Sequence, residues 1–182
     1  MASERDKIYQ QLLALRCRRG DADAWRELIA LWQPRLFYYI RRLVSQESDA
    51  WDVLQQTWLG AYQSIRTLSD PKLIATWLYR IARNKAISLR RIRMPETIET
   101  VDDSVTTEDD EQATFDNAEA VHRALDELSL PHREALTLHF LQDLSIEQIG
   151  DVLGVPQGTV KSRLFHARRE LKAVLERQQE AR

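Results

Sequence analysis

Apolar residues in the first half of the chain recur three or four positions apart, which is the spacing of one face of an α-helix. The pattern predicts helices over residues 3–20, 21–44, 49–65 and 74–93, and no stretch alternates as a half-buried strand would. Ser3 with the acids after it marks the first start, and Gly20 marks the first stop. Pro34 is expected to kink or restart the second helix, because proline removes a backbone donor.

Two of these helices have clear apolar faces. Residues that share a face in the third helix are Trp51, Leu54, Trp58, Ala61, Tyr62 and Ile65, and in the fourth Ile74, Trp77, Leu78, Ile81 and Leu89. Asp70 and Pro71 predict a cap followed by proline at the first helical position. All five tryptophans lie within residues 25–77, so residues 1–94 are expected to form one helical domain with a shared core.

The apolar pattern stops at residues 95–117, which carry almost no large apolar side chains and a run of acids. Such a composition favours a flexible linker. Helical signals return at residue 118. A proline-started helix follows Ser129, and Ser145 with Gln148 forms a capping box before a helix that Gly154 ends. The fold class is therefore all-α, with two small helical domains, 1–94 and 118–182, joined by an acidic linker.

Composition narrows the class of protein. The single cysteine, Cys17, excludes an internal disulfide and fits a reducing cytoplasm. No apolar run is long enough to span a membrane, and the first residues lack the apolar core of a signal peptide. We therefore expect a cytoplasmic protein without membrane insertion.

The net charge of −2 hides a strong segregation of charge. Residues 74–93 carry six Lys and Arg and no acid, whereas residues 95–120 carry ten Asp and Glu and no base. A segregated local field directs association more than the total charge does, so nucleic acid remains a candidate partner.

The last long helix is cationic on one side. Two helices separated by a turn at Gly154 are typical of a helix-turn-helix. Counting 100° per residue, Val160, Leu164, Ala167, Leu171 and Val174 face the domain core, and Lys161, Ser162, Phe165, Arg169 and Lys172 face the other way. Phe165 is predicted to be exposed, where an apolar ring can meet thymine methyl groups in a major groove while Lys161 and Ser162 read base edges. Arg163 and Arg168 lie towards the flanks, which suits phosphates.

The helix over residues 74–93 supplies a second basic face. Arg80, Arg83, Asn84, Arg90 and Arg91 lie opposite its apolar face. Cations with an amide among them can follow phosphates and hydrogen-bond unpaired bases.

Together these segments resemble bacterial RNA polymerase sigma factors of the sigma-70 family, extracytoplasmic-function (ECF, group IV) type. "SDAWDVLQQTWLGAYQSI" is similar to the core-binding region 2.2, and "WLYRIARNKAISLRR" to regions 2.3 and 2.4. "LPHREALTLHFLQDLSIEQIGDVLGVPQGTVKSRLFHARREL" is similar to region 4 over its whole length.

The resemblance implies partners and site residues for the first domain. Residues 49–65 would dock on the coiled coil of the polymerase β′ subunit through a polar face formed by Asp49, Asp52, Gln55 and Gln56. The loop over residues 64–72 would capture a flipped base of the −10 element. Arg80, Arg83 and Asn84 would hold the opened strand, and Arg90 and Arg91 would contact upstream phosphates.

For the rest of the chain the resemblance implies contact with the −35 element, the polymerase β flap and an anti-sigma factor. The −35 residues would be Thr159, Lys161, Ser162, Arg163, Phe165, His166 and Arg169. The acidic linker would occupy the positively lined RNA path of the polymerase. We also expect it to shield the basic surfaces when polymerase is absent.

The chain departs from the family pattern at three positions. Trp51 and Gln56 stand where many relatives carry acids, so docking on the polymerase is expected to use fewer charge contacts. His166 stands where many relatives carry arginine, and a neutral histidine is a weaker contact to phosphate or guanine.

Two other classes of protein fit the sequence less well than a sigma factor does. An enzyme has little support, because His122, His132, His139 and His166 lack metal-ligand spacing, no glycine-rich phosphate loop occurs, and no cofactor or metal is expected. His132 is expected to be exposed, and Cys17 half-buried. A duplex-DNA regulator is the alternative function, since similar helix-turn-helices end many response regulators. It would bind duplex DNA unaided, whereas a sigma factor needs polymerase.

Overall fold

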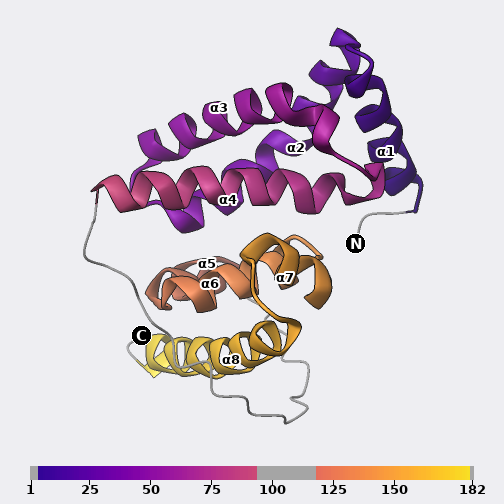
Figure 1. Ribbon diagram of the computed structural model, residues 1–182. Helices are drawn as coiled ribbons and strands as arrows, with labels where there is room; N and C mark the ends of the chain where they lie inside the picture. Colours follow the sequence, from indigo (N-terminus) through magenta and orange to yellow (C-terminus); the bar gives the residue numbers. More distant parts are fainter. Residues whose placement is uncertain (1–3, 94–117, 181–182) are drawn as a thin grey trace. The chain divides into compact units, whose positions relative to one another are not determined.

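The computed structural model describes residues 4–93 and 118–180, and every regular element in these ranges is helical. Two compact units are present, which confirms the predicted all-α fold class with two small helical domains (Figure 1). The first contains α1 (Glu4–Arg18), α2 (Ala22–Leu43), α3 (Glu47–Ser64), the 3₁₀ turns η1 (Ile65–Thr67) and η2 (Pro71–Leu73), and α4 (Ile74–Arg93). The second contains α5 (Ala118–Glu127), α6 (Leu130–Leu136), the π-helical turn η3 (Thr137–Leu141), most of α7 (Ile146–Leu153), and α8 (Gln157–Glu180). The proposed linker, residues 95–117, lies outside the described residues.

The start of α2 is fixed by Asp21. Its side chain accepts hydrogen bonds from the Asp23 and Ala24 backbone N–H groups at 2.9 and 3.0 Å, and Arg16 Nε donates to it at 2.8 Å. These bonds stabilise the carboxylate, so the Ala24 N–H foremost and then Arg16 lower the pKa of Asp21. An N-cap aspartate therefore ties the end of α1 to the start of α2.

An aromatic cluster holds α2 against α4. Tyr79 of α4 is fully buried and meets Trp32 and Tyr39 of α2 edge-on, with ring centroids 5.7 and 5.2 Å apart. Such tilted pairs contribute about 1 kcal/mol each beyond the area they bury. Burial raises the pKa of the Tyr79 hydroxyl well above its usual range. The cluster sets which face of α4 lies inside.

Three details of the sequence prediction differ in the first unit. The helix α2 continues through Pro34 without a restart, and Pro34 itself is exposed. Trp51 and Tyr62 lie outside the apolar face assigned to them and are 42% and 65% exposed. The reason is that α3 packs mainly through smaller residues (Ala50, Val53, Leu54, Thr57 and Ala61), which leaves the arc with Trp51 and Tyr62 outside.

The helix-turn-helix in the second unit follows the predicted signals closely. The Ser145 hydroxyl accepts from the Gln148 N–H at 3.2 Å, and the Ser145 N–H donates to the Gln148 side-chain oxygen at 3.0 Å. Gly154 ends α7 in the left-handed conformation with φ of 70°. Gly150 allows the close turn, because a Cβ there would lie 3.0 Å from the Val155 carbonyl oxygen.

Gly154→Ala should destabilise the protein by about 1 kcal/mol, because a side chain disfavours the left-handed conformation. Gly158→Ala is the matched control, since a Cβ at Gly158 meets nothing within 4 Å and Gly158 lies inside α8. Urea unfolding of the full chain followed by circular dichroism measures both. Equal loss of stability in the two variants would contradict the argument.

Cys17 is buried, where half-burial was expected, and burial raises the pKa of its thiol to about 11. A neutral thiol reacts poorly, so the native protein at pH 8 should resist a thiol-specific reagent while the urea-unfolded chain reacts at once. Stability should fall as the pH rises above about 9, because the unfolded thiol then ionises while the folded thiol does not. Cys17→Ala should remove that part of the pH dependence, measured by urea unfolding at pH 8 and 10.

Candidate nucleic-acid and polymerase interfaces

The open face of α8 carries fewer of the predicted DNA contacts than helix geometry suggested. Lys161 and Arg169 are exposed, and Thr159 and Arg163 are half-buried. Phe165 is half-buried, where full exposure was predicted, and the Arg169 guanidinium carbon lies 5.6 Å from its ring centroid. This cation–π contact holds the ring and the charge together on one surface.

Ser162 does not have the exposure expected of it. Its side chain faces away from the apolar arc of α8, yet the residue is 1% exposed. Its hydroxyl therefore cannot reach a base edge in this arrangement.

His166 is turned into the second unit and away from the open face. Its ring stacks on His132 of α6 at 6.3 Å between centroids, and its Nε2 atom is buried. His132, expected to be exposed, is buried, and its Nδ1 lies 2.6 Å from Glu170 Oε2. The contact of His166 with the −35 element stays a prediction, and in this structure the half-buried ring packs between α8 and α6.

The His132–Glu170 pair is the feature of this unit that sequence reasoning missed. The two residues are 38 positions apart, so no local spacing connects them. They meet because α6 packs along α8. One feature of the sequence could have indicated the pair. Glu170 lies close to the apolar arc of its helix, on a side that faces another helix.

The basic face of α4 is open at its centre. Arg80 and Asn84 are exposed, Arg83 between them is half-buried, and Arg91 near the end is exposed. The structure therefore brings these four predicted contacts to one side of α4. Their spacing along the helix suits a strand of nucleic acid more than a single ligand.

Arg90 belongs to the fold and is not an open cation. Its Nη1 donates a hydrogen bond to the Leu43 carbonyl oxygen at 3.1 Å, which satisfies a carbonyl at the last turn of α2. The phosphate contact of Arg90 stays a prediction, and in this structure its guanidinium joins α4 to α2.

Asp49 is likewise structural. It is 5% exposed, and its Oδ1 lies 2.8 Å from Arg93 Nη2. A buried carboxylate paired with a cation cannot also offer itself to a partner protein without a cost in stability. The docking role of Asp49 stays a prediction, and in this structure Asp49 joins the start of α3 to the end of α4.

The other three predicted docking residues are open. Asp52, Gln55 and Gln56 of α3 are all exposed. Trp51 lies beside them and stacks on Phe37 of α2 with ring centroids 4.2 Å apart. This surface is therefore mixed, with apolar rings beside the polar groups.

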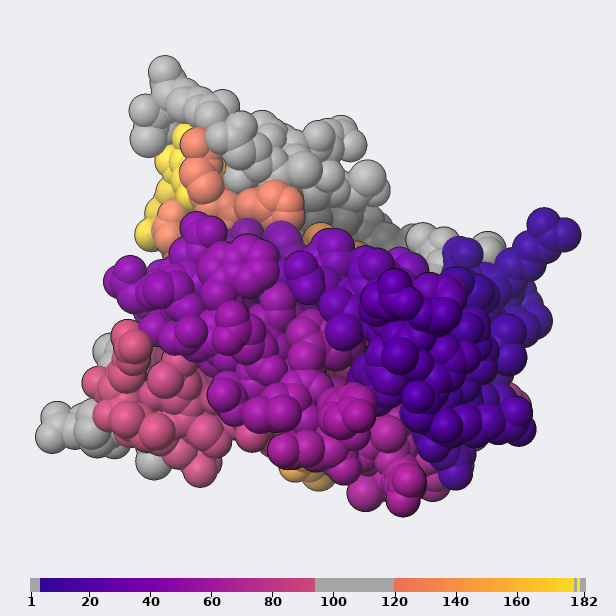
Figure 2. Space-filling model, turned by 90° about the horizontal axis from the view of Figure 1, so that it is seen from above, coloured from indigo at the N-terminus to yellow at the C-terminus, as the bar shows by residue number. Residues whose placement is uncertain are grey.

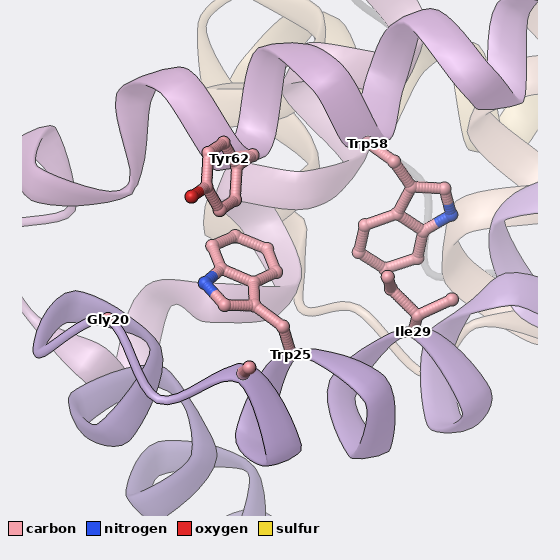
Figure 3. Close-up of a pocket in the computed structure, with 6 residues that line it drawn as sticks. Gly20, Trp25, Ile29, Trp58 and Tyr62 are labelled. Carbon is pink, nitrogen blue, oxygen red and sulfur yellow. The ribbon is translucent and has the colours of Figure 1, made fainter.

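A small pocket opens at the far end of the same helix (Figure 3). Its volume is about 190 Å³, and it is lined by Gly20, Ala22, Trp25, Ile29, Trp58 and Tyr62. The Trp25 and Tyr62 rings lie 5.3 Å apart at its mouth. The lining offers apolar contact and almost no charge.

Neither a metal cluster nor a membrane span occurs in the described part of the chain. No three His, Cys, Asp or Glu side chains are grouped so that they could hold an ion. None of the described helices is long and apolar enough to cross a membrane.

Comparison with known proteins gives two family matches that follow the two units. The family model "Sigma-70 region 2" matches residues 28–94, and "Sigma-70, region 4" matches residues 118–171. RNA polymerase sigma-H factor of Pseudomonas aeruginosa is 34% identical over 91% of this chain and 93% of its own length. The chain belongs to the sigma-70 family of RNA polymerase sigma factors.

Other relatives place this sigma factor in the ECF type. The ECF sigma-E factor of Haemophilus influenzae is 30% identical over 90% of this chain and 93% of its own. Among solved structures, CnrH in complex with the cytosolic domain of CnrY has a TM-score of 0.69, 26% identity and covers 92% of this chain and 97% of that chain. RpoE of Bartonella quintana, in complex with the anti-sigma factor NepR, has a TM-score of 0.66, 27% identity and covers 83% and 96%.

Asp49→Asn and Asp52→Asn should distinguish a residue that stabilises the fold, Asp49, from a residue proposed to dock on the polymerase, Asp52. Asp49→Asn should lower the free energy of unfolding by about 1–2 kcal/mol, because it removes a buried ionic partner of Arg93. Asp52→Asn, on the exposed side of the same helix, should leave unfolding unchanged and weaken binding to core polymerase. Urea unfolding and a core-binding titration on both variants check this, and the reverse pattern would contradict the assignment.

Proposed function

We propose that this sigma factor divides promoter recognition between its units. The first docks on core RNA polymerase through α3 and holds the opened −10 strand on α4, and the second reads the −35 duplex with α8. The observation that carries this division is the open basic face of α4, with Arg80, Asn84 and Arg91 exposed. A protein that reads only duplex DNA with a helix-turn-helix has no need of that face.

We choose the residues proposed to contact the −35 element by the exposure of their side chains. Lys161 and Arg169 are two of the exposed cations of the recognition helix, and Phe165 lies beneath Arg169. Lys161 is suited to base edges, whereas Arg163 and Arg169 are suited to phosphates on either side. Thr159, near the start of α8, completes the set.

Regulation by an anti-sigma factor is part of the proposal. The solved structures of CnrH and of RpoE from Bartonella quintana hold a bound cytosolic domain and an anti-sigma factor, respectively. The likeness covers 92% and 83% of this chain, so both of its units have counterparts there. We propose that a partner of this kind holds the protein inactive, and that it acts non-catalytically in the cytoplasm with the polymerase.

Run-off transcription from a pool of random promoters tests the function. With bacterial core polymerase, the protein should yield transcripts that share −35 and −10 elements, and neither component alone should do so. Lys161→Ala should lower transcription from the selected promoters about tenfold, because one base contact is lost. Lys7→Ala, at an exposed lysine of α1 outside every proposed contact surface, serves as the charge-matched control.

The alternative of an ordinary duplex-DNA regulator predicts another result. Such a protein would retard promoter duplexes without polymerase and would give no transcripts that depend on it. Gel retardation of the selected promoters, with and without core polymerase, distinguishes the two. Binding by the protein alone, together with no dependent transcript, would overturn the proposal.

A further inference from the structure

The first helix, α1, carries apolar side chains on two sides, and only one of these sides is buried. Leu13 and Cys17 face inward, where α1 packs on α2, α4 and the 3₁₀ turns. On the other side Ile8, Leu12 and Leu15 are 58%, 49% and 43% exposed. Figure 1 and Figure 2 show α1, in the darkest indigo, at one end of the first unit. A helix that is apolar on two sides is typical of one that is covered on both, so the outer side of α1 is a candidate interaction surface.

A charged residue stands at each end of this apolar line. Counting 100° per residue, the line lies within an arc of about 80° and consists of five exposed residues, here named the α1 seam: Glu4, Ile8, Leu12, Leu15 and Arg19. Arg19 directly follows α1, and its backbone N–H donates to the Arg16 carbonyl oxygen at 3.0 Å, so it continues the last turn. Lys7 lies about 100° around α1 from Ile8 and is outside the seam. The seam therefore runs from an acid through three apolar residues to a base.

The order of these residues makes the seam complementary to itself. Positions 4 and 19 have the same midpoint as positions 8 and 15, and this midpoint lies beside Leu12. When two copies of α1 lie antiparallel about a two-fold axis near Leu12, Glu4 meets the second copy's Arg19 and Ile8 meets its Leu15. Within one chain Glu4 and Arg19 are about 22 Å apart along the helix, so they cannot pair with each other. Only a second helix in the opposite direction satisfies both ends of the seam.

We propose that two copies of this chain associate through their α1 seams and form an antiparallel, two-fold symmetric dimer. The inference goes beyond the proposed function, since the seam shares no residue with the surfaces proposed for the polymerase or for promoter DNA. Two helices in contact over about four turns bury less surface than an interface of standard size, so the dimer is weak and reversible, with a Kd on the order of 10 μM.

Charge complementarity favours a second copy over an unrelated partner. The first turn of α1 is acidic and its last turn is basic. Antiparallel pairing brings Glu4 to Arg19 and to the neighbouring Arg18, which is also exposed. Arg16 of the same turn is already bound to Asp21 at 2.8 Å. Exposed ion pairs add little energy but fix orientation, so the apolar centre of the seam supplies the affinity and its charged ends set the direction.

Sedimentation velocity of the full-length protein tests the seam. Between about 1 and 100 μM the wild type should change from monomer to dimer and form nothing larger. Leu12→Asp should weaken the dimer at least about tenfold, because the two-fold axis brings two carboxylates together in an apolar contact. Leu59→Asp is the matched control, since Leu59 is 50% exposed on α3, outside the seam, and it should dimerise as the wild type does. Thermal unfolding of each variant separates loss of contact from loss of fold.

Charge reversal tests the antiparallel direction. Glu4→Arg and Arg19→Glu should each weaken the dimer about tenfold, because each variant alone places two like-charge contacts in the pair. An equal mixture of the two variants should dimerise as the wild type does, since every end contact of the mixed dimer then joins an arginine with a glutamate. The double variant should recover for the same reason. Weakening in the single variants without recovery in the mixture would overturn the inference, which requires these two positions to meet across the axis.

The remaining outcomes keep the inference distinct from the proposed function. If the wild type stays monomeric at about 100 μM, or if Leu59→Asp abolishes the dimer and Leu12→Asp does not, the seam joins no second copy and the inference is overturned. Dimerisation of the protein alone involves no polymerase, so this failure leaves the proposed function standing. Leu12→Asp should also bind core polymerase as the wild type does. A folded Leu12→Asp variant that binds no polymerase would assign the seam to the polymerase and overturn the inference.

Discussion

The buried contact of Tyr79 with Trp32 and Tyr39 is the constraint on which the first unit depends. It fixes the rotation of α4 against α2, with ring centroids 5.7 and 5.2 Å apart. Because burying one face of a helix exposes the opposite face, the same contact leaves Arg80 and Asn84 exposed. The basic surface proposed to bind the opened promoter strand is therefore a consequence of an aromatic core on the opposite side of the helix.

Some basic residues of α4 stabilise the fold and others are open to a partner, and the sequence alone does not distinguish the two groups. Arg90 donates to the Leu43 carbonyl and Arg93 pairs with buried Asp49, so the end of α4 is joined to α2 and to the start of α3. These contacts connect the helix proposed for strand binding with the helix proposed for polymerase docking. A partner that moved α3 would thus act directly on α4. Arg91, between the two, is left open.

The surface of α3 proposed to dock on the polymerase combines polar side chains with an exposed aromatic ring. Trp51 occupies a position where relatives carry an acid, and its ring rests on Phe37. An apolar contact gains from desolvation and loses nothing to salt, whereas surface ion pairs contribute little at physiological ionic strength.

The sequence by itself determined the helices, the two-unit organisation, the helix-turn-helix and the family, because these depend on local signals: apolar periodicity, the Ser145 capping box and the left-handed turn at Gly154. Most of the open positions, such as Arg80, Asn84, Lys161 and Arg169, also follow from periodicity alone. The tertiary structure alone decided that Asp49, Arg90 and His166 belong to the packing and that Trp51 lies outside. The physical reason is that a charged or aromatic side chain at the edge of an apolar arc can turn either way, and only the neighbouring helix determines which.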